Sequence, residues 1–161
     1  MLTRLDRALG RIVAAAQWLV LPIAALLLLQ WPLREIVQRF SREANDLGQA
    51  LFALYVSVAL TAALRAHAHL HTDVVAHRYP NRVRRALTVG GLLLATIPWS
   101  LFVLVTHAEP AWRSLVGLEA FPDTFNPGYF VVKLAAWLMA LLLLLQSLVD
   151  LARAWRRGGP A

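Results

Sequence analysis

Four long stretches without charge dominate the pattern of polar and apolar positions. The stretches that contain no Asp, Glu, Lys or Arg are residues 12–33, 47–64, 86–108 and 134–149. A hydrocarbon core about 30 Å thick requires about 20 helical residues at about 1.5 Å each. None of the stretches has the polar stripe that a helix of a soluble protein presents every three or four residues. The pattern therefore predicts an all-α integral membrane protein with four transmembrane helices, over about residues 12–33, 47–65, 84–107 and 129–151.

The first stretch is preceded by three arginines, as in a secretory signal peptide. Its apolar run is longer than the 7–15 residues of a signal core, and it ends in Gln30-Trp31-Pro32 rather than in a small-residue cleavage site. We expect it to remain in the protein as a membrane span, with Trp31 as an aromatic anchor at the interface.

The first and third of the loops between the predicted spans carry weaker patterns. Residues 33–44 place charged and apolar side chains on opposite sides of a helix. This predicts an amphipathic helix on the membrane surface, and it fits the solvated end of the first span equally well. Asn45 and Asp46 are expected to cap the second span, with Gln49 three residues beyond as in a capping box. Turn residues predict a short helix near residues 111–118 in the third loop.

Composition and charge support one membrane domain over residues 1–161. The chain is 59% hydrophobic and only 16% charged, which excludes a disordered chain, and it has no cysteine with which to form a disulfide framework. The net charge of +7 is concentrated in the two tails and in the second loop. The positive-inside rule then places both termini and the second loop in the cytoplasm. We expect the basic run at residues 82–85 to meet anionic lipid headgroups, and we expect no nucleic-acid partner.

The spans offer little chemistry of their own. Their central parts hold no ionisable group of the kind that binds ions or carries protons in a membrane. Pro22 and Pro98 are expected to kink the first and third spans, the sharper alternative being a broken-helix binding site. Lone Ser57, Ser100 and Ser147 are expected to bond to the preceding helical turn. The chain is therefore predicted not to be an enzyme and not to transport a solute alone.

Histidines give no clear metal or haem site. His67 and His71 have the i, i+4 spacing of a metal pair, but no compelling third ligand accompanies them. A haem between membrane helices requires histidines on two spans at matching depth, and only His107 lies in a predicted span. We expect no cofactor and no metal ion in this chain.

The second loop resembles the corresponding loop in the small membrane subunit of tripartite ATP-independent periplasmic (TRAP) transporters, the DctQ-type family. The matching sequence begins with Ala63-Leu64-Arg65 and ends with a proline before an arginine run. The residues that carry the resemblance are Arg65, His69, His71, Asp73, Pro80 and Arg84. It extends over about residues 15–155. The family's acidic pair before the second span is replaced here by REANDLGQ, with Glu43 and Asp46 as partial substitutes.

The resemblance implies a role in a bacterial inner-membrane complex. Such subunits accompany a large membrane subunit that carries the substrate and sodium sites, and a periplasmic protein delivers the substrate, often an organic acid. The small subunit would be a scaffold that braces the elevator motion of the large one. Within the motif, Arg65 would pair with Asp73 in a structural role. Alternatives are a membrane anchor of an electron-transfer complex and a stand-alone small transporter.

The periplasmic loops would contribute the contacts with the binding protein. The candidate residues are Arg39, Arg42, Glu43, Asp46, Glu119 and Asp123.

Overall fold

The computed structural model describes residues 2–36, 41–66 and 80–156. Within these ranges it contains four helices that are long and apolar enough to cross a membrane, as predicted. The first is formed by α1 (Leu2–Ala16), η1 (Gln17–Leu19) and α2 (Val20–Glu35), and the second by α3 (Arg42–Arg65). The third is formed by α5 (Asn81–Gly91), η2 (Leu92–Thr96) and α6 (Ile97–Val116), and the fourth by α7 (Tyr129–Arg156).

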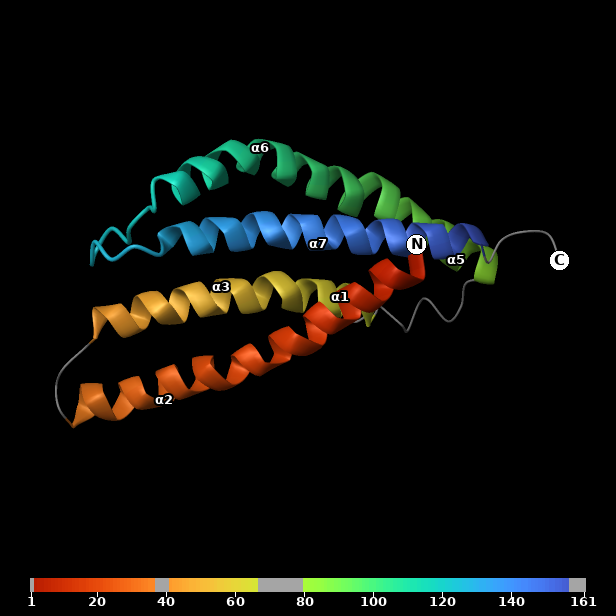
Figure 1. Ribbon diagram of the computed structural model, residues 1–161. Coiled ribbons are helices and arrows are strands. Elements are labelled where there is room, and N and C mark those ends of the chain that lie inside the picture. The colour runs from red at the N-terminus through yellow and green to blue at the C-terminus, as the bar shows by residue number, and fades with distance from the viewer. Residues whose placement is uncertain (1, 37–40, 67–79, 157–161) are drawn as a thin grey trace.

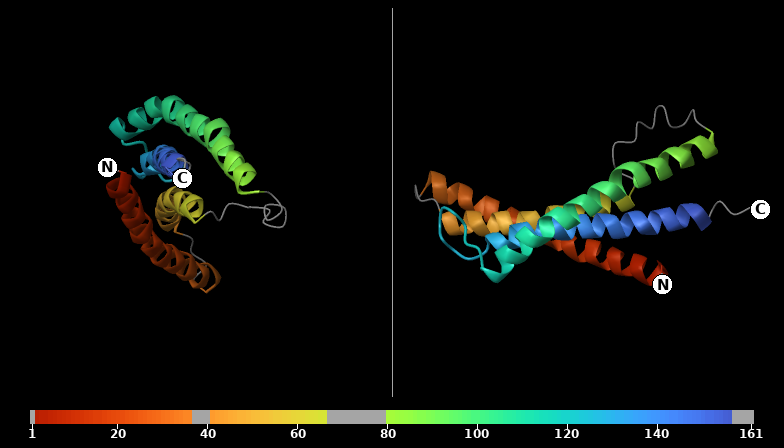
Figure 2. Two further views of the ribbon diagram at one scale, coloured as in Figure 1. Left: turned by 90° about the vertical axis from the view of Figure 1, so that its right-hand side faces the viewer. Right: turned by 90° about the horizontal axis from the view of Figure 1, so that it is seen from above.

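The helix α7 is the centre of the bundle. It packs along α3 on one side and α6 on another, whereas the first span packs mainly on α3 and reaches α7 through α1 (Figures 1 and 2). A cluster of buried apolar residues joins α1, α3 and α7, consisting of Leu9, Ala16, Val58, Leu142 and Val149. The charged face of α1 points away from this cluster, because Arg4, Arg7 and Arg11 are exposed.

Small polar side chains fill much of the remaining interior. Ser57, Thr61, Ser100, Gln146 and Ser147 are all buried. Apolar burial gives little driving force in lipid, so helices associate through close packing and hydrogen bonds, which small residues permit. Ser57 and Ser147 each donate to a carbonyl of the preceding turn at 2.7 Å, as predicted. The prediction is wrong for Ser100, whose hydroxyl has no hydrogen-bond partner among the described residues.

Both predicted proline distortions are present. A proline has no N–H to donate to the carbonyl four residues earlier, and its ring clashes with that carbonyl. Four residues before Pro22 is Trp18, which lies in the 3-10 turn η1. Four residues before Pro98 is Leu94, which lies in the π-helical turn η2. Each span thus changes its helical pitch where the hydrogen bond is lost, and it remains one long helix (Figure 1).

The helix starts and the loops differ from the predictions in two places. The cap of α3 is Ser41, whose hydroxyl accepts from the Ala44 amide at 3.2 Å, so Asn45 and Asp46 lie inside the helix rather than at its cap. The predicted short helix near residues 111–118 is instead the last part of α6. The helix continues through Pro110 because Ala111 and Ser114 extend its buried face.

The described residues contain no separate interfacial helix after the first span. The helix α2 continues to Glu35 and α3 begins at Arg42, while residues 37–40 lie outside the described ranges. Glu35 therefore belongs to the last turn of α2.

Most of the apolar surface of the bundle faces outward. Only 6% of the most apolar window of the first span and 11% of that of the third are buried, against 33% for the fourth. Large exposed side chains include Leu28 and Trp31 of α2, and Phe102 and Val105 of α6. Such surfaces are stable only against lipid or another membrane protein.

The packing of α1 can be tested by truncating one side chain. Leu9 is 2% exposed in the cluster between α1, α3 and α7, whereas Leu28 is 71% exposed on α2. We expect Leu9→Ala to lower the free energy of unfolding by about 2 kcal/mol through the cavity that it leaves. Reversible unfolding in mixed detergent micelles measures this change, and Leu28→Ala is the matched control that should differ little from the parent chain. Equal effects of the two substitutions would contradict the packing described here.

Candidate functional site

Charged side chains join three helices at the end of the bundle where α1 begins and α7 ends. Arg65 is the last residue of α3, and its Nη1 lies 2.9 Å from Asp6 Oδ1 of α1. The same nitrogen donates to Gln146 Oε1 of α7 at 2.9 Å. Gly10 of α1 lies beside this guanidinium, and a Cβ there would make an ordinary contact with Arg65 Nη2 at 3.5 Å. One arginine thus links α1, α3 and α7.

Two further residues of α7 complete this network. Gln146 Nε2 donates to both carboxylate oxygens of Asp150 at 3.0 Å. Arg153 pairs with Asp6 at 2.5 Å and with Asp150 at 3.4 Å. Gln146 is fully buried, and the side chains of Asp6 and Arg65 are only about a quarter exposed. Two carboxylates and two guanidinium groups balance one another, so these charges are compensated at the edge of the hydrocarbon region.

The opposite end of the bundle is joined by a different set of polar contacts. Asp46 of α3 is buried and accepts a hydrogen bond from the Thr124 hydroxyl. The Thr124 hydroxyl oxygen accepts in turn from the Asn126 amide at 3.3 Å. The loop between α6 and α7 is therefore attached to the beginning of α3, although residues 46 and 124 are far apart in the sequence.

The loop itself is shaped around one aromatic residue. Phe121 is buried, and its ring meets that of Tyr129 edge to face at a centroid distance of 5.6 Å. Gly128 has a φ of 152° and lies against this ring, so that a Cβ there would come within 3.0 Å of Phe121. Only glycine combines this backbone conformation with so close an approach.

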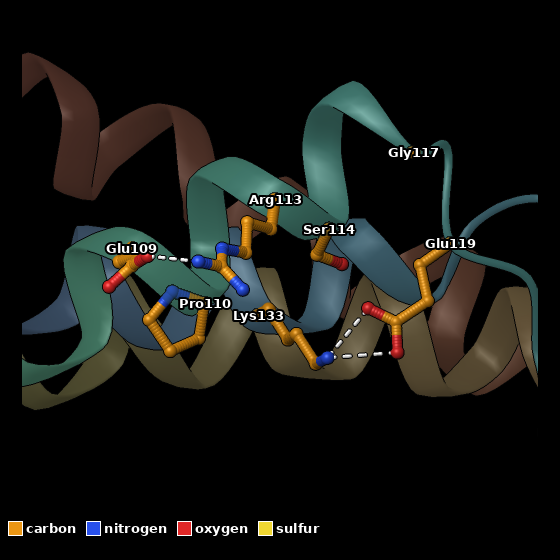
Figure 3. Close-up of a pocket in the computed structure, with 7 residues that line it drawn as sticks. All are labelled: Glu109, Pro110, Arg113, Ser114, Gly117, Glu119 and Lys133. Atoms are coloured by element: carbon orange, nitrogen blue, oxygen red, sulfur yellow. Dashed lines mark hydrogen bonds and ion pairs between the residues drawn. The ribbon is translucent and has the colours of Figure 1, made fainter.

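A pocket of about 520 Å³ opens between α6, this loop and α7 (Figure 3). On one side, Arg113 pairs with Glu109 one turn earlier at 2.5 Å. On the other, Lys133 Nζ of α7 holds the two carboxylate oxygens of Glu119 at 2.8 and 2.6 Å. The hydrogen bond from Lys133 lowers the pKa of the Glu119 carboxyl below its ordinary value. The pocket offers paired charges of both signs beside the hydroxyl of Ser114.

The predicted periplasmic contacts fall into two groups at this end. Arg42, Asp46 and Asp123 line a small polar hollow of about 270 Å³, together with Asn45 and Thr124. Glu119 lies in the neighbouring pocket with Lys133, and Glu43 accepts from the cap hydroxyl of Ser41. Arg39 lies outside the described residues. The structure thus brings Asp123 close to Arg42 and Asp46, although Asp123 is far from both in the sequence.

The motif of the second loop is only partly described. Arg65 ends α3, Pro80 precedes α5, and Arg84 lies in its first turns. His69, His71 and Asp73 lie outside the described residues, so the pairing of Arg65 with Asp73 stays a prediction. The structure instead gives Arg65 the partners Asp6 and Gln146. These partners of Arg65 were not predicted, because no spacing in the sequence connects residues 6, 65 and 146. The spacing of Gln146, Asp150 and Arg153 does place three polar groups on one side of α7.

Metal ligands do not gather in the described part of the chain. No three His, Cys, Asp or Glu side chains there come close enough to hold an ion. His107 lies in α6, with its Nε2 buried and without a hydrogen-bond partner among the described residues.

Comparison with protein families decides the identity of this bundle. A family model described as "Tripartite ATP-independent periplasmic transporters, DctQ component" matches residues 23–157. The chain belongs to the DctQ family. It is a multi-pass membrane protein, the small DctQ subunit of a TRAP transporter, and not an enzyme. No curated protein and no solved structure matches it.

Family membership confirms the resemblance carried by the second loop. It also implies that this DctQ subunit works in a TRAP complex with the DctM subunit and a periplasmic binding protein. The network around Arg65 and the polar contacts at the opposite end of the bundle are then features of one subunit of that assembly.

The strength of the link between α1 and α3 can be measured by a double-mutant cycle. Asp6→Asn and Arg65→Gln should each destabilise the DctQ subunit, and their coupling energy should be about 1–3 kcal/mol because the pair is partly buried. Glu109 and Arg113 form the matched control pair, exposed and one turn apart, for which we expect about 0.5 kcal/mol or less. Unfolding in mixed micelles gives both energies. A coupling no larger than that of the control pair would mean that Arg65 does not hold the two helices together.

Proposed function

We propose that this DctQ subunit is a scaffold that braces DctM during sodium-coupled uptake of an organic acid delivered by the periplasmic binding protein. The observation that carries the proposal is the distribution of charge in the described spans. Their charged residues, buried Asp46 included, lie towards the two ends of the bundle, and the buried polar groups deeper between the helices are neutral hydroxyls and the amide of Gln146. A solute-coupled ion pathway needs ionisable or ion-ligating groups at mid-membrane depth, which this arrangement does not offer.

The surface of the bundle supports the same role. The first and third spans present most of their apolar side chains outward, and Arg65, Asp6 and Gln146 hold three helices in fixed positions. A rigid element with a wide lateral apolar surface can hold a larger partner in place while part of that partner moves. Sodium ions and the substrate would bind in the partner subunit rather than here.

We further propose that both termini lie in the cytoplasm. The structure supports this orientation by collecting the exposed arginines of α1 and α5 at the same end of the bundle as Arg153. By the positive-inside rule that end is cytoplasmic. The hollow lined by Arg42, Asp46 and Asp123 then faces the periplasm, where its mixed charges suit a polar contact with the binding protein.

Co-expression tests the scaffold role. We expect this chain to copurify with DctM in detergent, and we expect uptake in proteoliposomes only when DctQ, DctM, the binding protein and a sodium gradient are all present. Asp6→Asn combined with Arg65→Gln should lower the yield of the complex, while the exposed control Glu109→Gln should not. Solute flux by this chain alone in liposomes would overturn the proposal.

The orientation can be tested by cysteine labelling, because the chain has no cysteine of its own. Asp123 and Arg84 are both exposed and lie at opposite ends of the bundle. In cells with a permeable outer membrane, a membrane-impermeant maleimide should label Asp123→Cys directly and Arg84→Cys only after the inner membrane is opened. The reverse order of labelling would place the termini in the periplasm.

A further inference from the structure

An apolar groove runs between α3 and the third span, with α7 as its floor. It has a volume of about 510 Å³ and is lined by Leu60, Leu64, Ala95, Thr96, Trp99 and Leu143. Leu143 is buried at the bottom, whereas Trp99 at the side is 47% exposed. The groove exists because α3 and α6 both pack chiefly on α7, and because the π-helical turn η2 places two small residues, Ala95 and Thr96, in its wall.

The position of Leu143 along α7 shows how deep in the bilayer the groove lies. Leu143 lies ten residues from Lys133 and seven from Asp150, which mark the charged ends of this span, so it is close to the middle of the bilayer. Arg85 of α5 donates to the Ala154 carbonyl at 2.5 Å, eleven residues beyond Leu143. At about 1.5 Å per residue, this bond lies roughly 16 Å from the groove floor. That is about half of a 30 Å hydrocarbon core, which is the length of one acyl chain.

The groove and Arg85 also share one side of the bundle. Eleven residues are close to three full helical turns, so Leu143 and Ala154 lie on the same face of α7. In the end-on view of Figure 2, α5 lies on the opposite side of α7 from α1. Trp155 follows at this level and is exposed, as expected of an aromatic side chain at the interface.

The rim above the groove is basic. Arg82, Arg84 and Arg85 of α5 are exposed, and neither Arg82 nor Arg84 forms an ion pair with another described residue. Among the described residues of this end, the carboxylates of Asp6 and Asp150 both pair with arginines. Asp150 lies on the same face of α7 as the groove, but it is turned to Gln146 and Arg153. A phosphate here would therefore meet positive charge from α5.

We propose that this groove binds an anionic phospholipid from the leaflet on the side where α1 begins. One acyl chain lies between α3 and α6 against Trp99, and the phosphate is held by Arg82 and Arg85. An apolar slot near mid-membrane depth, about one acyl chain below a cluster of arginines, is complementary to a lipid with a negatively charged headgroup. Zwitterionic lipids fill the groove but gain less from the arginines.

Quenching of tryptophan fluorescence by brominated lipids tests this proposal. The full chain is reconstituted in phosphatidylcholine vesicles that contain either phosphatidylglycerol or phosphatidylcholine with brominated acyl chains. We expect brominated phosphatidylglycerol to quench at a concentration roughly fivefold lower, since one arginine near a membrane surface contributes about that factor. Trp99→Phe should remove this excess quenching, while Trp112→Phe, a change of an exposed tryptophan at the other end of the helix, should retain it.

Two further variants separate the headgroup from the acyl chain. Arg82→Gln removes a charge that no described residue uses, so it should reduce the preference for phosphatidylglycerol, while Arg113→Gln at the far end of the same span should not. Ala95→Phe fills the groove without changing charge, and it should abolish the excess quenching of Trp99. Circular dichroism checks that each variant is folded. Equal quenching by the two lipids, or an excess that persists in folded Trp99→Phe or Ala95→Phe, would overturn the proposal.

Discussion

The contact between Arg65, Asp6 and Gln146 determines how the rest of the bundle can be arranged. A guanidinium group at the edge of the hydrocarbon region must find partners, because no bulk water is present to replace them. Here the partners come from α1 and α7, so satisfying one charge fixes the relative positions of three spans. The apolar cluster around Leu9 and Val149 packs on the same side. Electrostatic and packing requirements are thus met by one geometry.

At the opposite end of the bundle, polar and charged side chains are also paired, here through the loop between α6 and α7. Asp46, Thr124 and the ion pair between Glu119 and Lys133 attach the connection between α6 and α7 to the helices on both sides. Charge is therefore confined to two layers, about one membrane thickness apart, with neutral packing between them. Such an arrangement leaves the middle of the bundle to apolar and neutral polar packing, in a subunit of a complex that also contains DctM.

The sequence predicted the number of spans and their approximate bounds, because the cost of burying charge in lipid leaves charge-free stretches of the required length. It also predicted the distortions near Pro22 and Pro98, which follow from local covalent geometry. It did not predict that Asp6 would meet Arg65, because that pairing depends on how α1 crosses α3. The cap at Ser41 is a local hydrogen bond, and it was missed because Asn45 and Asp46 are equally good capping residues a few positions later. The extension of α6 past Pro110 was missed because it depends on tertiary packing, which local residue preferences do not determine.

The π-helical turn in the third span has a consequence for the register of its two halves. Counting back seven residues from buried Ser100, along the face that also includes Ala111 and Ser114, leads to Leu93. Yet Leu93 is 43% exposed, and its neighbour Leu92 is buried instead. Leu92 lies on the same helical face as Arg85, which is seven residues earlier. The extra residue of η2 rotates the first half of the span by about one position relative to the second. A single uninterrupted helical wheel drawn for this span would therefore assign the wrong face to every residue on one side of the turn.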